Sequence, residues 1–279
     1  MTQGGSSLQI FLSVTPGEAR AAAPYHQTPA HVAYRIGSGS TLLRAGLLLE
    51  TRGGLLCVSD REAPAIEAPA ALCQAVLREC GRRGYQGVLL DFEETPKPDR
   101  VSFARQLERS LAPRHLPLYL PETYAAPASG AVPLICTALS GGNFRQRLQE
   151  AAAHWGGAGR LALDVQRLRM DFRLPAPTGE GEPLTAEAFQ RLVQEERPSV
   201  FFSPDLCARY FTYSRQGQHH FVLFDDAPTL RQKLKVGASM GFSAAFFMWP
   251  EICDIAGELF RSQNKKRCCT HWCSIFLKH

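Results

Sequence analysis

Apolar runs and helical patterns alternate along most of the chain. Short apolar runs of strand length recur at 8–14, 31–36, 42–50, 54–60, 87–93, 116–122, 132–139, 160–165, 199–204 and 244–250. Between them, apolar residues at three- and four-residue spacing predict helices at 69–83, 98–111, 143–155, 185–195 and 227–240. This alternation predicts a parallel sheet with helices outside it, and strands that are apolar on both faces predict a sheet that is covered on both sides.

Two architectures fit this pattern, an open doubly wound sheet and a closed barrel. The first strand is followed by LSVTPGE, which is not the glycine-rich phosphate turn of a dinucleotide fold. Acidic residues stand at or just after the ends of several strands, namely Asp60, Asp91, Glu93, Glu122, Asp164, Asp205 and Glu251. In a closed barrel such ends meet at one mouth, where enzymes of this class build their sites. We therefore predict an α/β protein with a single-domain (β/α)8 TIM barrel.

The region before the last helix and strand interrupts the alternation. The stretch YSRQGQHHFVLFDD (213–226) predicts a β-hairpin around Gln216 and Gly217, followed by a helix that Asp225 or Asp226 could cap. The segment 174–185, rich in proline and glycine, predicts a loop. We expect the barrel to span residues 1–262 with this hairpin as an insertion, followed by an irregular cysteine-rich tail over residues 263–279.

Composition narrows the classes of function. With 279 residues, 45% of them hydrophobic, the chain can bury a sizeable core. Its net charge of +5 is mild and no basic block interleaved with aromatic residues precedes the C-terminus, so nucleic acid is not an expected partner. The nine cysteines lie partly in apolar runs and indicate a reducing compartment. The tail cluster of Cys268, Cys269, His271 and Cys273 matches no usual zinc spacing, so we expect no metal or other cofactor.

The N-terminal region carries no recognisable targeting signal. Its apolar run LQIFLSV is short, lacks a basic region before it and has no convincing cleavage site, so no signal peptide is expected. No apolar run approaches the length that spans a bilayer. These features predict a cytoplasmic protein without a membrane span, and they leave its oligomeric state open.

The segment GYQGVLLDFEE (84–94) has the most informative pattern in the chain. Asp91 and Glu93 share one face of the predicted strand, while Val88, Leu90 and Phe92 share the other. Two neighbouring carboxylates at the end of a buried strand repel each other and lose hydration, which is costly unless a site uses them. We interpret this as a catalytic strand end. The alternative is that Asp91 caps the next helix and Glu93 belongs to a polar loop.

These residues also resemble a known family. The segment resembles the fourth-strand signature of glycoside hydrolase family 18, which has an aspartate, a glycine and then D-x-D-x-E. Residues 210–251 resemble the end of its spore-germination, peptidoglycan-processing branch, with a hairpin, the F-[ED]-D-A run at 224–227, a helix and a strand bearing Trp249. LPLYLPETYA resembles the fifth strand. Covering roughly residues 70–252, the resemblance implies a (β/α)8 barrel, hydrolysis of N-acetylglucosamine-containing polysaccharide or oligosaccharide, and an association with spores.

The resemblance also implies roles for individual residues. In this family the substrate's own 2-acetamido group is the nucleophile, so the protein supplies one proton donor, here Glu93. Asp91 would orient the acetamido group, stabilise the developing positive charge and help to raise the pKa of Glu93. Trp249 would lie under the bound sugar, or it is an ordinary core tryptophan. Glu122 and Tyr124, after the fifth strand, complete the set of candidate substrate-binding residues.

The chain departs from the family pattern at three places. Gln86 and Leu89 stand where the family has its first and middle aspartates. In the sixth strand, residues 136–139 read Cys-Thr-Ala-Leu where the family has M-T-Y-D, so the tyrosine that binds the acetamido oxygen is replaced by Ala138. Loss of one such donor typically costs about 100- to 1000-fold in rate. Tyr124, after the fifth strand, is a candidate substitute for this tyrosine.

Three hypotheses about function follow. The first is an active glycosidase that cleaves β-1,4 bonds next to N-acetylglucosamine, with reduced activity. The second is a catalytically weakened barrel that acts as a glycan-binding or spore-coat structural protein. The third is a different barrel enzyme that uses Asp91 and Glu93 with a metal ion. The retained acid pair favours the first and the missing tyrosine favours the second, while the histidines show no ligand spacing for the third.

Overall fold

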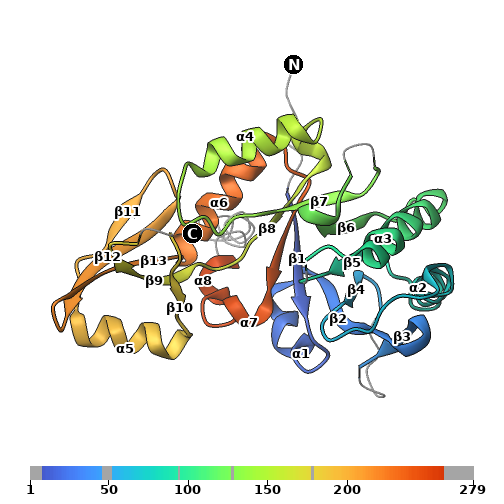
Figure 1. Cartoon of the computed structure of the whole chain (residues 1–279), viewed down its shortest axis with the longest axis horizontal. Coiled ribbons are helices and arrows are strands. Elements are labelled where there is room, and N and C mark those ends of the chain that lie inside the picture. Colours follow the sequence, from blue (N-terminus) through green and yellow to red (C-terminus); the bar gives the residue numbers. More distant parts are fainter. Residues whose placement is uncertain (1–7, 46–51, 94, 127–128, 177–178, 261–279) are drawn as a thin grey trace, which may run out of the picture.

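The computed structural model describes residues 8–45, 52–93, 95–126, 129–176 and 179–260. Eight parallel strands form its main sheet (Figure 1), and they are β1 (Gln9–Val14), β2 (Thr28–Gly37), β4 (Leu55–Ser59), β5 (Val88–Asp91), β6 (Leu118–Pro121), β7 (Val132–Cys136), β8 (Ala162–Asp164) and β14 (Ala244–Met248). Each strand pairs with the next in this order, and β1 pairs with both β14 and β2. The sheet is therefore closed, and the predicted (β/α)8 barrel is confirmed.

Helices cover the outside of this barrel. The longer ones are α2 (Pro69–Arg83), α3 (Pro98–Leu111), α4 (Phe144–His154) and α6 (Ala227–Met240), and the shorter ones are α1 (Ala19–Ala22), α7 (Trp249–Ile252) and α8 (Ala256–Phe260). Both α2 and α3 begin with a proline, and α2 ends at Gly84 in the left-handed conformation, φ 66°. Within the described part of the chain, β2 leads instead to the antiparallel strand β3 (Thr41–Arg44), and β6 leads to the 3₁₀ turn η4 (Glu122–Tyr124).

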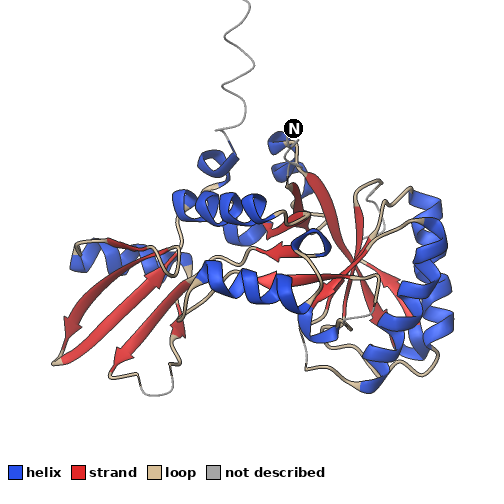
Figure 2. Cartoon of the chain, turned by 90° about the horizontal axis from the view of Figure 1, so that it is seen from above, coloured by secondary structure: helices blue, strands red, loops and turns tan. Residues whose placement is uncertain are grey.

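A second sheet is inserted between β8 and α6 and lies beside the barrel (Figures 1 and 2). It is antiparallel, in the order β10-β9-β13-β12-β11, and α5 (Ala186–Glu196) packs on one face. Its strands are β9 (Arg169–Leu174), β10 (Glu182–Pro183), β11 (Phe201–Ser203), β12 (Ala208–Arg215) and β13 (Gln218–Phe224). The predicted hairpin is β12 and β13, and Gln216 and Gly217 at its turn have φ of 52° and 77°.

The insertion is larger than the predicted hairpin, and several assignments change. The run 199–204 pairs with β12 in the insertion and not with a barrel strand. The start of the run 42–50 lies in β3, which pairs antiparallel to β2 and is not one of the parallel barrel strands. The segment 174–185, predicted as a loop, contains the end of β9 and all of β10. Apolar runs predict strands without revealing which sheet they join, because pairing is decided by contacts distant in the sequence.

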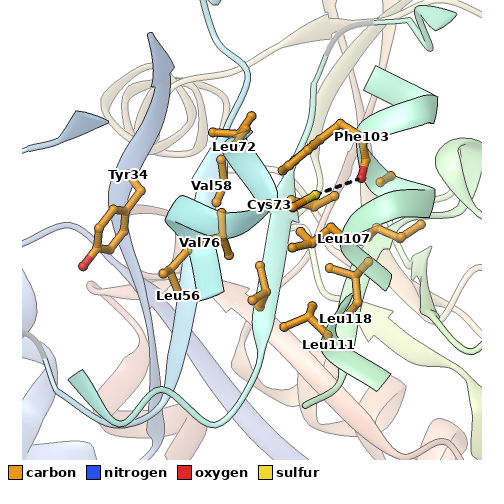
Figure 3. Packing of buried hydrophobic residues seen from close by; sticks show 14 of the residues in the cluster. Tyr34, Leu56, Val58, Leu72, Cys73, Val76, Phe103, Leu107, Leu111 and Leu118 are labelled. Atoms are coloured by element: carbon orange, nitrogen blue, oxygen red, sulfur yellow. Dashed lines mark hydrogen bonds between the residues drawn. The ribbon is translucent and has the colours of Figure 1, made fainter. Parts of the chain in front are cut away.

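The hydrophobic core lies in layers on the two sides of the barrel wall. Inside the barrel, one cluster contains Phe11, Ala30, Leu55, Cys57, Leu89, Tyr119, Ala162, Ala244 and Phe246. Outside it, α2 and α3 pack on β4 and β5, and the carbonyl oxygen of Phe103 accepts a hydrogen bond from the Cys73 Sγ at 4.0 Å (Figure 3). Leu89 faces inward while Val88 and Leu90 face outward, so the alternation turns Asp91 toward the inside.

The described residues contain free cysteines and no helix suited to crossing a membrane. The cysteines among the described residues are all free thiols, at positions 57, 73, 80, 136, 207 and 253. None of the described helices combines the length and hydropathy that a membrane crossing requires. The predicted cysteine-rich tail lies outside the described residues.

Asp225 and Lys233 form a fully buried ion pair at the base of the insertion. The Lys233 Nζ donates to the Asp225 Oδ2 at 2.7 Å, and neither side chain is exposed. Thr229 Oγ1 donates to the other oxygen at 2.8 Å, and the backbone N–H of Leu168 donates to Oδ2 at 3.1 Å. Leu168 precedes β9 and Asp225 follows β13, so this carboxylate joins both ends of the insertion to α6.

Asp226 is the residue that caps α6. It accepts a hydrogen bond from the Thr229 backbone N–H at 2.9 Å, and the Thr229 hydroxyl accepts one from the Asp226 N–H at 3.0 Å. This reciprocal capping box satisfies two donors at the helix start. The Arg209 guanidinium also pairs with the Asp226 carboxylate. The F-[ED]-D-A run that supported the resemblance thus has a structural role here.

Replacing Asp226 with alanine is expected to lower the free energy of unfolding by about 1–2 kcal/mol, because it removes the side-chain acceptor of the cap. Urea denaturation followed by circular dichroism measures the change. Asp226→Asn keeps an acceptor but loses the charge that faces Arg209, so it should lose less stability. Equal losses in the two variants would show that the cap is not the source of the effect.

Candidate active site

Asp91 and Glu93 lie at the carboxyl end of β5, where the barrel opens. Asp91 is the last residue of the strand, its Cα partner on β4 is Ser59, and its side chain is half-buried. Glu93 follows the strand with an exposed side chain, and its backbone N–H donates to the Asp60 Oδ1 at 3.0 Å. Phe92, between them, belongs to the outer core. The structure thus brings the two predicted acids together at one end of the barrel.

Acids from other strands converge on the same mouth. Asp60 directly follows β4 and is fully buried. Asp164 ends β8, and its Cα partners are Cys136 on β7 and Phe246 on β14. The charges of Glu93, Asp164 and Asp60 all act on Asp91. The mouth is therefore an acidic environment built from several strand ends.

The pKa values of the two strand-end aspartates reflect this environment. Burial, followed by the negative charges of Glu93, Asp164 and Asp60, raises the pKa of Asp91 from 3.8 to about 6. Burial also raises the pKa of Asp164 from 3.8 to about 6, with the charge of Glu251 adding to it. A hydrogen bond from the Gln166 Nε2 to the Asp164 Oδ2, at 2.7 Å, opposes that rise. Both carboxyls therefore exchange protons within about one unit of pH 6, close to neutrality.

Neutralising Asp91 is expected to stabilise the protein at pH 7. Its pKa rises from 3.8 to about 6 on folding, so the folded state binds more protons and loses stability as the pH rises through this window. Asp91→Asn should raise the free energy of unfolding at pH 7 by about 1–3 kcal/mol. The gain should be much smaller at pH 4, where Asp91 is protonated in the folded state and partly protonated in the unfolded state. Urea denaturation at pH 4 and pH 7 measures this, and a gain that is equal at both pH values would contradict it.

Glu122 is placed beside α4. Its carboxylate forms an ion pair with Arg147 of α4, and it accepts a hydrogen bond from the Trp155 Nε1 at 3.5 Å. About a third of the side chain remains exposed, at 32%. Glu122 therefore lies after β6 as the sequence predicts, with its carboxylate already partnered from the neighbouring helix.

Tyr124 lies in the outer core. Its ring packs edge-on against Phe92, with ring centroids 5.2 Å apart, and only 4% of the residue is exposed. Phe92 is on the opposite face of its strand from Asp91. Tyr124 thus packs behind the strand end that carries the acids, and its role as a replacement for the missing sixth-strand tyrosine stays a prediction.

Trp249 is packed as a core tryptophan. It is 7% exposed, and its ring lies 5.5 Å from that of Tyr25, measured between centroids. It shares the outer cluster of β14 with Phe247. Met248 ends β14, two residues after Phe246, which belongs to the cluster inside the barrel, so alternation places Met248 on the inner face. Met248 was not among the predicted site residues, although its two-residue spacing from Phe246 is visible in the sequence.

Position 138, where the family pattern has tyrosine, contacts the insertion. Ala138 packs against a cluster that includes Leu168 and Phe172 of the insertion. The neighbouring Cys136 points toward the mouth beside Asp164, and burial raises the pKa of its thiol. Among the residues that the structure describes, no three His, Cys, Asp or Glu side chains are grouped so that they could hold a metal ion.

The fold matches known glycan-processing enzymes. No protein-family model and no curated protein sequence matches the chain. The spore cortex-lytic enzyme SleL of Bacillus megaterium QM B1551 superposes with a TM-score of 0.65 at 12% identity, over 93% of this chain and 76% of that one. A chitinase from Chromobacterium violaceum ATCC 12472 gives a TM-score of 0.65 at 15% identity, over 88% and 95%.

A third solved structure with this fold is a chitinase of glycoside hydrolase family 18. The family 18 chitinase from Cycas revoluta, in complex with (GlcNAc)3, superposes with a TM-score of 0.63 at 10% identity, over 89% of this chain and 97% of that one. At such low identity these likenesses establish a common architecture. The chain therefore has the barrel fold of glycoside hydrolase family 18 chitinases and of the spore cortex-lytic enzyme SleL, in agreement with the resemblance of its sequence motifs.

Proposed function

We propose that this protein is a glycosidase that hydrolyses β-1,4 bonds next to N-acetylglucosamine, in peptidoglycan or chitin-like glycans. The observation that carries the proposal is the pair of Asp91 and Glu93 at the mouth of a family 18-like barrel, with the charge of Glu93 acting on Asp91. The likeness to a cortex-lytic enzyme supports spore peptidoglycan as one substrate and spore association as one location.

Glu93 would act first as a proton donor. The carbonyl oxygen of the substrate's 2-acetamido group attacks the anomeric carbon while the Glu93 carboxyl gives its proton to the glycosidic oxygen. The bond between that carbon and oxygen breaks, the leaving sugar departs with a new hydroxyl, and a cyclic oxazolinium ion remains. Glu93 then takes a proton from water, whose oxygen attacks the same carbon and reopens the ring. The anomeric configuration is retained.

Asp91 would stabilise the charged intermediate. As a carboxylate it can accept a hydrogen bond from the acetamido N–H and oppose the positive charge of the oxazolinium ion. Its half-buried position favours this role, because electrostatic interactions strengthen where water is partly excluded. The exposed side chain of Glu93, with its backbone held by Asp60, is accessible to the leaving oxygen.

A second candidate function is a weakened barrel that binds glycan or serves as a spore-coat structural protein. The observation that favours it is Ala138, which packs against the insertion where the family pattern has the tyrosine that binds the acetamido oxygen. Loss of such a donor costs about 100- to 1000-fold in rate. Binding without turnover would distinguish this candidate from a slow enzyme.

The test compares chitin oligosaccharides with matched, fully deacetylated glucosamine oligosaccharides and with fragments of spore cortex. New reducing ends measure cleavage, proton NMR reports the anomer formed first, and calorimetry measures binding separately. Cleavage of acetylated substrates only, with the β-anomer released first, is expected because the acetamido oxygen is the nucleophile. Equal cleavage of the deacetylated oligosaccharides would contradict the mechanism, and binding with no cleavage would favour the second candidate.

A further inference from the structure

Asp91 lacks the usual acidic neighbour on its own strand. Leu89 occupies the position of the middle aspartate of the family pattern, and the structure places it in the apolar cluster inside the barrel, 4% exposed. Nothing on β5 below Asp91 can therefore exchange a proton with it or repel its charge. Apart from Glu93, which follows the strand, any charged group that acts on Asp91 from inside the barrel has to come from another strand.

Asp164 is placed to be that group. It ends β8, and Ala162, two residues earlier on the same face, belongs to the cluster inside the barrel. Alternation therefore turns the Asp164 carboxyl into the mouth, as it does for Asp91. The strand order β8-β7-β6-β5 puts the two aspartates three strands apart around the barrel, facing a common opening.

The local contacts hold the Asp164 carboxyl in place. Gln166, two residues further along, donates from its Nε2 to the Asp164 Oδ2 at 2.7 Å. On the neighbouring strands, the Cα partners of Asp164 are Cys136 and Phe246, neither of which is charged at neutral pH. Among these three residues, only Gln166 has a polar contact with the Asp164 carboxyl, and its side-chain amide is neutral. Neither neighbouring strand places a positive charge opposite Asp164.

We propose that Asp164 is a positioning residue of this site, whose carboxyl acts across the barrel mouth on Asp91 in place of the missing middle aspartate. The kinetic part of this inference rests on the proposed function. Its electrostatic part concerns the free protein alone.

Other titratable groups also lie around the two aspartates, and the experiment has to separate their effects on Asp91 from that of Asp164. Asp91 faces Glu93 and Asp60, and its charge also acts on the Cys57 thiol. Asp164 faces Glu251 and the Cys136 thiol, which is itself influenced by Lys233 and Arg147. Glu93 acts on Asp91 more strongly than Asp164 does, so removal of Asp164 should lower the titration midpoint of Asp91 without restoring its ordinary value.

The consequence for catalysis has a definite sign. In the proposed mechanism Asp91 has to be ionised to stabilise the positive intermediate. A negative charge at Asp164 disfavours that ionisation, so Asp164 should move the acidic limb of the pH profile toward neutral pH. The native protein would then lose activity as the pH falls through about 6, and a variant without the Asp164 charge would stay active at lower pH.

The experiment uses Asp164→Asn, with Asp171→Asn as the matched control. Asp171 lies in the insertion, where its carboxylate is hydrogen-bonded to Tyr213 and His220. Its replacement also exchanges a carboxylate for an amide. Carbon-13 NMR follows the aspartate carboxyl carbons of the free protein, with the Asp91 signal assigned from its absence in Asp91→Asn. The Asp91 midpoint is expected to fall by about half to one pH unit in Asp164→Asn and to stay unchanged in Asp171→Asn.

Kinetics provide the second measurement. The acidic limb of kcat/KM on a chitin oligosaccharide should shift down by the same amount in Asp164→Asn, with Asp164→Ser as a second variant in case the amide disturbs Gln166. An unshifted Asp91 midpoint in a folded Asp164 variant would overturn the inference, whether or not the protein cleaves glycans. A shifted midpoint together with no cleavage by the native protein would instead overturn the proposed function.

Discussion

Replacing Glu93 with glutamine is expected to lower kcat on acetylated oligosaccharides by about 10²–10⁴-fold, with KM little changed. Glutamine keeps the size of the side chain and cannot donate a proton to the glycosidic oxygen. Binding should survive, because Glu93 lies exposed after β5 and its fixed contact, the bond to Asp60, uses its backbone N–H. The loss should therefore appear in turnover and not in affinity.

Initial rates of reducing-end release and calorimetry on the same preparations measure the two quantities. Glu67→Gln is the matched control, since Glu67 is an exposed glutamate just before the start of α2 and has no assigned role in the reaction. Its kinetics should equal those of the native protein. A Glu93→Gln variant that kept more than about a tenth of the native kcat would exclude Glu93 as the general acid.

Replacing Lys233 with methionine is expected to cause a large loss of stability, about 3–5 kcal/mol. The change leaves the Asp225 carboxylate fully buried with only the Thr229 hydroxyl and the Leu168 N–H as donors. For a protein of this size the thermal midpoint should fall by about 6–20 °C. Because Asp225 joins both ends of the insertion to α6, the insertion should loosen first, which hydrogen exchange in β9 and β13 can detect.

The double variant Lys233→Met with Asp225→Asn separates a lost attraction from an uncompensated charge. Asparagine can still accept from Thr229 and Leu168, so the double variant should recover at least half of the loss. Lys235→Met, an exposed change on the same helix, should be close to neutral. A double variant as unstable as the single one would show that packing around Lys233, and not the buried charge, dominates.

Much of the barrel was predictable because local pattern decides it. The helices 69–83, 98–111 and 227–240 have the predicted bounds, since their apolar spacing and their proline or aspartate starts are local signals. The inward direction of Asp91 followed from the two-residue period of a strand whose other face is apolar. The hairpin turn at Gln216 and Gly217 was equally local, because it needs two residues that tolerate positive φ.

The candidate site was predictable only in part. The acids at the strand ends were visible in the sequence. Their neighbours across the mouth were not, because seven described elements of secondary structure lie between the strands that end at Asp91 and Asp164. The buried rings of Tyr124 and Trp249 show the same limit. An aromatic residue after a strand can line a site or fill the core, and only its packing partners, here Phe92 and Tyr25, decide between the two.

The sequence by itself determined the class of fold, the helix bounds and the position of an acidic strand end at Asp91 and Glu93. Those features rest on periodicity, capping and alternation, which act over a few residues. The tertiary structure decided that 199–204 joins an inserted sheet, that Asp225 and Lys233 neutralise each other in the core, and that Asp164 shares the mouth with Asp91. These depend on closure of the barrel and on burial, which bring distant residues together and raise the energy of their charges.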